Sequence, residues 1–276
     1  MALSLALLLV PAHSEATAFA GPPPDVDALT CQAVRAQQLI ERRWREFEFR
    51  TRETTYKLSG GEVTERKSKT RRVHRSRPDG IEVSELLVRD GVPLAAGDRE
   101  RSEREAGERL AELRDDPRAL GRAIAARDED SDSKYELLGS VRDGFELELL
   151  GLDWIGDVPC WVVGFRPRPG FSGETRAERN LEKFRGVAWI QADDPVLRLL
   201  ELDFIDSFSV KFGALATLTA GSHLRLEQRE VAPGVTMTDT LTLDLHLRIL
   251  FLFRKSERRV KEYRDFVRVN RPVAEP

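Results

Sequence analysis

The sequence predicts a mainly β protein with a few helices, in which a strongly curved antiparallel sheet is covered by an N-terminal helix and an inserted charged helix. Three observations support this fold class. Apolar and polar residues alternate over most of the chain, two-residue turn signals separate successive strands, and helical periodicity is confined to a few stretches. The expected strands are long, which suits a curved sheet better than a small sandwich.

The first twenty residues are typical of a secretory signal peptide. Leu3 to Val10 is a compact apolar run, and Ala18-Phe19-Ala20 has the small residues that signal peptidase requires. No Lys or Arg precedes the apolar run, so a buried N-terminal helix is the alternative. We predict a signal peptide over 1–20, a single domain over 21–276 and a periplasmic location.

An amphipathic helix is expected next. Asp25 or Asp27 can cap a helix that runs to about Phe47. Its apolar residues fall close to one stripe: Val26, Leu29, Val34, Leu39, Ile40 and Trp44. Such a stripe must cover an apolar surface, so we expect the helix to pack on the sheet.

Antiparallel hairpins follow this helix. From Phe47 the apolar period is two, and the turn signal Gly60-Gly61 leads to a returning strand over Glu62 to Arg75, followed by a strand over Ile81 to Arg89. The segment from Arg66 to Arg77, which includes most of this returning strand, is strongly basic, with seven cations: Arg66, Lys67, Lys69, Arg71, Arg72, Arg75 and Arg77. It is either a patch for lipid headgroups or another anionic partner, or a charged outer strand that prevents aggregation; we favour the outer strand.

A charged helical insertion is predicted over 98–127. It contains eight acidic residues and eight arginines, with pairs such as Glu100 and Arg104 four residues apart, and it is interrupted at Pro117. We expect a polar link over Asp128 to Ser133 and a strand over Tyr135 to Leu138.

Strands then continue to the end of the chain, apart from one short helix over Thr175 to Phe184. The clearest strand has seven apolar residues at period two: Leu241, Leu243, Leu245, Leu247, Ile249, Phe251 and Phe253. A final strand is expected over Arg259 to Val269. Between earlier strands, Phe208 to Gly221 is apolar where polar turn residues are usual. It either covers the mouth of a cavity, with Phe212 and Leu215 as a gate, or continues its strands as a plain hairpin.

Composition and motifs exclude several functions. The chain has 276 residues and a formal net charge of −3, which argues against nucleic acid as a partner. His74, His223 and His246 have no metal-ligand spacing, and hydrolase and nucleotide-binding motifs are missing. We therefore expect no catalytic residue, no metal site and no cofactor.

The only two cysteines, Cys31 and Cys160, exclude a disulfide-rich scaffold. In an oxidising compartment they could form one disulfide between the first helix and the sheet, for about 2–4 kcal/mol. Two separate buried thiols are an equal alternative, because no spacing rule places them close together.

One segment resembles a known superfamily. Gly186 to Leu199 reads GVAWIQADDPVLRL and is similar to the G-x-V-W-I-D-x-x-D-x-x-hydrophobic-R run of LolA-like outer-membrane lipoprotein-sorting proteins; the preceding PCWVVGFRPRP, Pro159 to Pro169, also resembles that superfamily's pattern. The resemblance implies an incomplete antiparallel barrel with a helix-capped apolar concave face. It also implies a carrier of acyl chains or a sensor of envelope lipids. The charged helix over 98–127 makes this chain longer than those carriers.

We therefore expect a non-enzymatic periplasmic carrier or envelope sensor that holds an acyl chain of a lipid or lipoprotein. The residues expected to line the concave face are Trp44, Phe47, Phe49, Trp161, Leu243, Leu245, Leu247, Ile249 and Phe251. The alternative is an envelope interaction scaffold whose interior is filled by its own side chains. We expect a monomer with transient membrane contact, an envelope protein as a further partner and no nucleic acid.

Overall fold

A single curved antiparallel sheet forms the body of the protein. The computed structural model describes residues 22–269 except 172, 174, 213 and 250–252. The strands are β1 (Phe47–Ser59), β2 (Glu62–Arg75), β3 (Glu82–Arg89), β4 (Val92–Pro93), β5 (Phe145–Ile155), β6 (Val158–Pro167), β7 (Phe184–Gln191), β8 (Leu197–Phe204), β9 (Phe208–Phe212), β10 (Ala214–Leu218), β11 (His223–Ala232), β12 (Val235–Ile249) and β13 (Phe253–Arg268).

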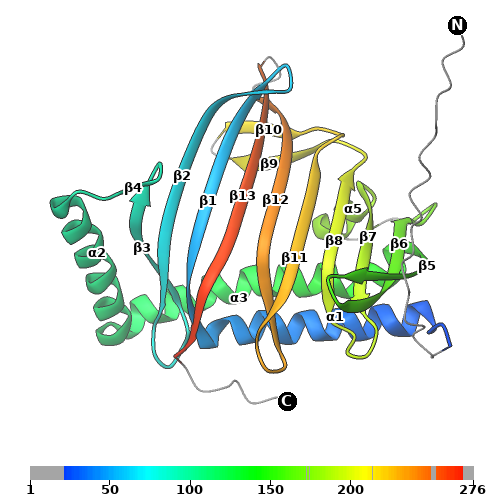
Figure 1. Cartoon of the computed structure of the whole chain (residues 1–276), viewed down its shortest axis with the longest axis horizontal. Helices are drawn as coiled ribbons and strands as arrows, with labels where there is room; N and C mark the ends of the chain where they lie inside the picture. Colours follow the sequence, from blue (N-terminus) through cyan, green and yellow to red (C-terminus); the bar gives the residue numbers. More distant parts are fainter. Residues whose placement is uncertain (1–21, 172, 174, 213, 250–252, 270–276) are drawn as a thin grey trace, which may run out of the picture.

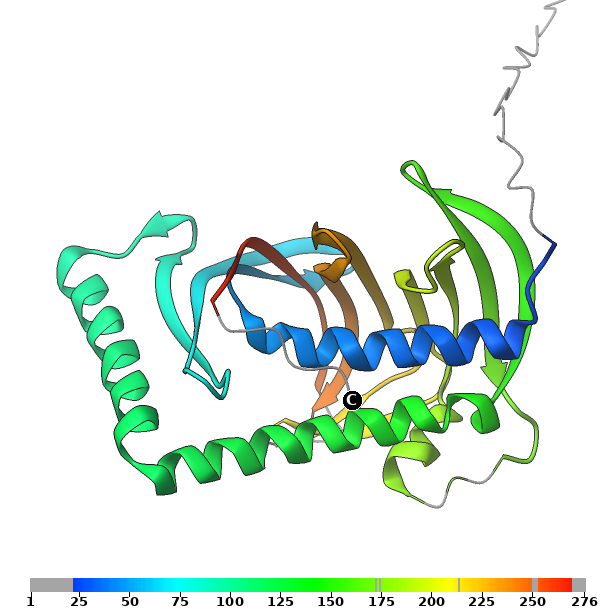
Figure 2. The ribbon, with the colours of Figure 1, turned by 90° about the horizontal axis from the view of Figure 1, so that it is seen from below.

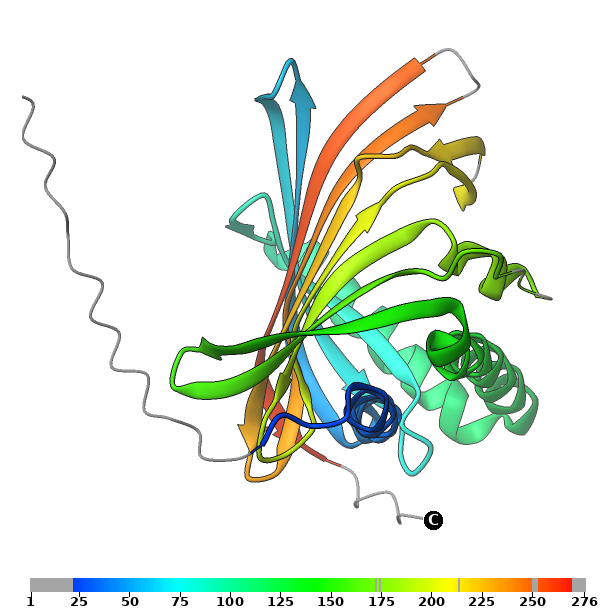
Figure 3. The same ribbon diagram turned by 90° about the vertical axis from the view of Figure 1, so that its right-hand side faces the viewer.

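The sheet is not closed into a barrel. Its order is β4-β3-β2-β1-β13-β12-β11-β8-β7-β6-β5, and the hairpin of β9 and β10 joins through β10 and β12. Viewed from the side, the strands bend around a concave face while the two outer strands stay apart (Figure 3). The predicted fold class, a strongly curved and incomplete antiparallel barrel with helices, is confirmed.

Two long helices run side by side across one end of the concave face (Figures 1 and 2). They are α1 (Val26–Arg43), which continues as a short 3-10 turn over Trp44–Glu46, and α3 (Pro117–Gly139). The other helices are α2 (Ala96–Asp115), α4 (Val141–Gly144) and α5 (Arg176–Leu181). No helix in the described part of the chain combines the length and the apolar character that a membrane crossing requires.

Helix α1 begins and packs as its sequence predicts. The Asp25 side chain accepts a hydrogen bond from the Ala28 backbone N–H at 2.8 Å, which caps the helix. Leu29 and Ala33 pack with Trp161, Val163 and Ile190 of the sheet. About two turns after Ala33, Ile40 packs with a second group: Phe47, Val196, Val235 and Met237. One helix face therefore joins both halves of the sheet.

The charged insertion is larger than predicted. The helix does break at Pro117, but α3 starts there and continues to Gly139, so the expected polar link over 128–133 and the expected strand over 135–138 are both helical. Proline is well tolerated at the first position of a helix. Helix α3 lies against α1, α4 and α5, and this tertiary packing outweighs the weak local strand preference.

The basic strand β2 is an outer strand only in part. Strand β3 pairs with β2 from Lys69 to Arg75, so only the first half of β2 has an open edge. The short helix expected over 175–184 is present as α5.

Candidate functional site

An apolar cavity lies between α1 and strands β5 to β8. It has a volume of about 210 Å³ and is lined by Thr30, Ala33, Val34, Gln37, Val141, Phe145, Leu147, Val163, Phe165, Leu181, Phe184, Ala188, Ile190, Leu197, Leu200 and Leu202. For comparison, an apolar cavity of about 150 Å³ can hold benzene, whereas pockets for drug-sized ligands have about 300–1,000 Å³. The apolar cavity therefore has space for a short hydrocarbon segment.

The strand register explains why this wall is apolar. Val163, Ala188 and Leu200 are direct neighbours on β6, β7 and β8, so their side chains point to the same side of the sheet. In the middle strand the small residues Gly186 and Ala188 leave space above the sheet. At Gly186 a Cβ atom would clash with the Glu201 backbone carbonyl and would lie 2.6 Å from the ring of Phe165, so only glycine fits there.

Only two residues of the wall have polar side chains, Thr30 and Gln37. The Gln37 Oε1 atom accepts a hydrogen bond from the Gln228 Nε2 group at 3.1 Å. The Thr30 Oγ1 atom is buried and has no hydrogen-bond partner. A hydroxyl group without a partner in an otherwise apolar wall is energetically unfavourable, unless a ligand supplies the partner.

The apolar surface continues from the cavity onto β12. Leu202 of the cavity wall neighbours Leu224 of β11, which in turn neighbours Leu243 of β12. Leu245 and Leu247 lie further along β12 and pack with Phe204, Leu218 and Leu224. The β12 residues predicted from the sequence, Leu243, Leu245, Leu247 and Ile249, thus share a face with the cavity but lie beyond its wall. Phe251 lies outside the described residues.

The aromatic residues predicted near the first helix lie elsewhere. Phe47 and Phe49 are buried, and the Trp44 ring packs edge-on against Phe49 and Tyr263 at centroid distances of 4.9 and 5.3 Å. Trp161 packs against α1 next to the cavity and is not part of its wall. The structure thus places Trp44, Phe47 and Phe49 at the opposite end of α1 from the apolar cavity, and their part in ligand binding stays a prediction.

A second depression, here called the charged hollow, adjoins that aromatic group. It has a volume of about 420 Å³ and is lined by Glu41, Trp44, Arg45, Phe49, Arg75, Gly80, Ile81, Glu82, Arg127, Ser131, Thr238, Lys261 and Tyr263. The Arg75 side chain is 6% exposed; its Nε group donates to the Phe47 carbonyl at 3.0 Å, and Glu82 lies 3.5 Å from its guanidinium. Burial lowers the pKa of Arg75, against the opposing effects of Glu82 and Glu48.

The segment proposed as a gate forms a hairpin. Strands β9 and β10 pair with each other, and Leu218 at the base of β10 pairs with Leu247 of β12. The plain-hairpin alternative describes this backbone. The side chains of Phe212 and Leu215 lie outside those that the structure describes, so their role as a gate stays a prediction.

The two cysteines are free thiols in this structure. Trp161 points toward α1, and strand alternation directs the neighbouring Cys160 side chain to the opposite face of β6, away from Cys31 on the helix. The disulfide alternative is therefore corrected in favour of two separate thiols. Burial raises the pKa of Cys160 to about 11, which keeps this thiol protonated and unreactive at neutral pH.

The three histidines lie on separate strands. Each has a hydrogen-bonding neighbour of its own: Glu85 for His74 at 2.8 Å, Asp203 for His223 at 3.0 Å and Ser256 for His246 at 3.0 Å. Within the described residues, no group of three or more His, Cys, Asp or Glu side chains has the arrangement of a metal site.

Comparisons with known proteins give structural likeness only. No family model matches the chain, and no curated protein matches its sequence. Among solved structures, a DUF1329 family protein from Desulfovibrio piger is 15% identical, with 88% of this chain and 93% of that chain covered and a TM-score of 0.35. A LolA superfamily protein from Nitrosomonas europaea is 10% identical, with 91% and 96% covered and a TM-score of 0.33.

A third solved structure is a putative outer membrane lipoprotein-sorting protein domain from Vibrio parahaemolyticus, which is 9% identical, with 86% and 91% covered and a TM-score of 0.33. Likeness at this level concerns the general course of the chain and carries no conclusion about ligands.

Proposed function

We propose that this protein is a non-enzymatic periplasmic carrier or sensor that holds an acyl chain of a lipid or lipoprotein. The observation that carries the proposal is the apolar cavity beneath α1, whose wall has hydrocarbon side chains at all but two positions. The signal-peptide pattern at the N-terminus supports the location. An interaction scaffold with a filled interior, the alternative function, is less well supported because this cavity is present.

The cavity alone would bind an acyl chain weakly. Each buried methylene contributes about 0.8 kcal/mol, so five methylenes would contribute about 4 kcal/mol, which corresponds to a millimolar dissociation constant. Tighter binding requires more buried chain. The apolar face that continues over Leu202, Leu224 and Leu243 supplies that surface, because these residues form a row across three neighbouring strands.

The test is to fill the cavity from its wall. Ala188→Leu adds three carbons beneath α1, and we expect it to weaken binding of the fluorescent fatty acid cis-parinaric acid by about tenfold, in line with the usual cost of overpacking. Val187→Leu is the matched control, because Val187 lies on the opposite face of the same strand. Native mass spectrometry of protein purified without detergent from a bacterial periplasm would show whether a lipid is already bound.

Two results would overturn the proposal. One is that the unaltered chain does not bind the fatty acid and that no lipid co-purifies with it. The other is that Ala188→Leu and Val187→Leu bind it as tightly as the unaltered chain, since the ligand would then lie outside the cavity.

A further inference from the structure

The apolar cavity and the charged hollow lie next to each other along α1. Gln37 is in the wall of the cavity, and Glu41 is in the wall of the hollow. Four residues along a helix correspond to about 6 Å. The border between the two is the hydrogen bond from Gln228 to Gln37, and Gln228 is paired with Thr238 of the hollow. The two hollows are therefore adjacent along α1 and are separated by this hydrogen bond.

Cations outnumber carboxylates in the charged hollow. Four cationic side chains and two carboxylates belong to its wall: Arg45, Arg75, Arg127, Lys261, Glu41 and Glu82. The hydroxyl groups of Ser131 and Thr238 also lie there. This hollow has the chemistry to bind an anionic group, whereas the cavity beside it does not.

The concave surface of the sheet also changes from apolar to cationic side chains between strands β12 and β13. On the concave side of β12 the residues are Leu241, Leu243, Leu245 and Leu247; their direct neighbours on β13 are Lys261, Arg259, Glu257 and Lys255. The row that starts at Leu202 in the cavity passes through Leu224 and Leu243 and reaches Arg259 after three strand steps, roughly 14 Å.

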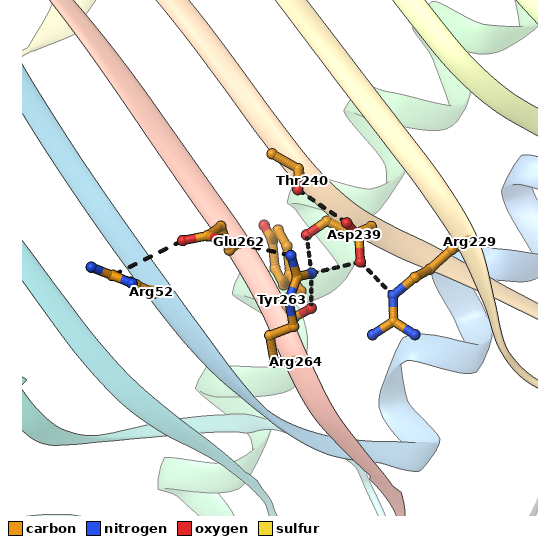
Figure 4. Close-up of polar contacts among 7 residues, drawn as sticks. All are labelled: Arg52, Arg229, Asp239, Thr240, Glu262, Tyr263 and Arg264. Carbon is orange, nitrogen blue, oxygen red and sulfur yellow. Dashed lines mark hydrogen bonds and ion pairs between the residues drawn. The ribbon is translucent and has the colours of Figure 1, made fainter. Parts of the chain in front are cut away.

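Beyond β13 the concave face carries both charges. The neighbours of Lys261 on β1 and β2 are Glu53 and Lys69, and those of Arg259 are Thr55 and Lys67. The ion pairs on the opposite face have a different arrangement. There Arg264 pairs with Asp239 and Glu262, and Asp239 also pairs with Arg229 (Figure 4). Those outer-face cations have carboxylate partners, as does Lys67 on the concave face, which pairs with Glu65.

Two cations of the β13 row share one carboxylate. The Glu257 side chain is 1% exposed and is bound by both Lys255 and Arg259. The Lys261 Nζ atom lies 5.0 Å from the centroid of the Tyr263 ring, and no described carboxylate forms an ion pair with it. Lys261 belongs both to the row and to the charged hollow, which makes it the central cation of this border.

We infer that the ligand is an amphiphile with an anionic headgroup, whose acyl tail occupies the apolar cavity and whose headgroup lies against Lys261 and Arg259. This inference rests on the proposed function. A neutral headgroup would cover these cations without neutralising them, and the loss of their hydration would oppose binding. An anionic headgroup replaces that hydration with charge-assisted hydrogen bonds. The negative charge of the headgroup therefore decides which amphiphile binds, and burial of its acyl tail supplies most of the affinity.

The experiment compares two probes with the same tail. cis-Parinaric acid carries a carboxylate, and its methyl ester is neutral; binding of each is measured by fluorescence with the full chain at low ionic strength and at 0.5 M salt. We expect the acid to bind about tenfold more tightly at low ionic strength, and this preference to shrink in salt because exposed charges are screened. Lys261→Gln should remove most of the preference without weakening binding of the ester.

The matched control is Arg254→Gln. Arg254 is an exposed cation on the same strand whose side chain points to the outer face, so its removal should leave the preference unchanged. Circular dichroism checks that each variant is folded, and Arg259→Gln provides a second variant if Lys261→Gln does not fold.

The outcomes are distinguishable. If acid and ester bind equally, or if Arg254→Gln removes the preference as completely as Lys261→Gln does, the inference is wrong while the proposed function stands. If neither probe binds, both fail.

Discussion

The apolar cavity and the charged hollow lie under one helix and on one sheet, yet they have opposite chemistry. Near the start of α1 the residues facing the sheet are Thr30, Ala33 and Val34, and the strands beneath supply aliphatic side chains and phenylalanines. Near its end, Trp44 packs against Phe49, and the space beside them is lined by charged groups. The residues that surround each space, not the helix or the sheet alone, therefore set its chemistry.

The largest expected effect is on the aromatic group at the charged hollow. Phe49 is 4% exposed and contacts Trp44, Tyr263 and Phe266 at centroid distances of 4.9, 5.8 and 5.5 Å. Phe49→Ala should lower the free energy of unfolding by about 3–5 kcal/mol, as is usual for a buried phenylalanine. Urea denaturation measures this loss. A loss below about 1 kcal/mol would show that the aromatic group is loosely packed. The two ends of α1 would then not differ in how tightly the side chains beneath them pack.

A smaller effect is expected at Glu257, next to the leucines of β12. Burial raises the pKa of this carboxyl, but the hydrogen bonds from Lys255 and Arg259 lower it more, so its pKa is below the usual 4.5. A lowered pKa stabilises the fold above pH 4.5, and this stabilisation is lost as the pH falls through the folded-state value. Glu257→Gln should cost about 1–2 kcal/mol at pH 7, less than for a fully buried pair because both cations reach solvent.

The pH dependence gives the measurement for this site. The unaltered chain should lose stability between pH 5 and pH 3 more steeply than Glu257→Gln does, as followed by thermal unfolding at each pH. Parallel curves for the two proteins would mean that the carboxyl contributes nothing to acid sensitivity. The Glu257 carboxyl would then not be needed to hold Lys255 and Arg259 beside the leucines of β12.

The smallest expected effect is in the apolar cavity, and it has the opposite sign. Thr30→Val replaces a buried hydroxyl that has no partner with a methyl group of similar size, so the free energy of unfolding should rise by about 1 kcal/mol. Chemical denaturation without ligand measures it. The control is Thr64→Val at an exposed position of β2, where the hydroxyl donates to the Lys57 carbonyl and no gain in stability is expected. A decrease in stability would indicate that the Thr30 hydroxyl is hydrogen-bonded in solution, for example to water in the cavity.

Much of the fold follows from local pattern. The cap at Asp25, the break at Pro117 and the alternating leucines of β12 each depend on a few neighbouring residues, so each could be predicted. The residues over 128–138 could not, because packing of α3 against other elements decided their helical state. The cysteines show the same limit: their sequence separation contains no information on which face of β6 Cys160 occupies.

The candidate site shows this limit most clearly. The sequence shows which residues of each strand share a face, and the leucines expected from β12 do lie on the concave side. It does not show where the helix crosses the sheet, because that depends on side chains far apart in the chain filling space together. Hence the cavity residues of β5 to β8, such as Val163, Ala188 and Leu202, were not identified although they alternate just as clearly. The apolar faces of the strands and the first helix are local properties of the chain; the place where they leave a hollow, and the charge beside it, arise only from the packed structure.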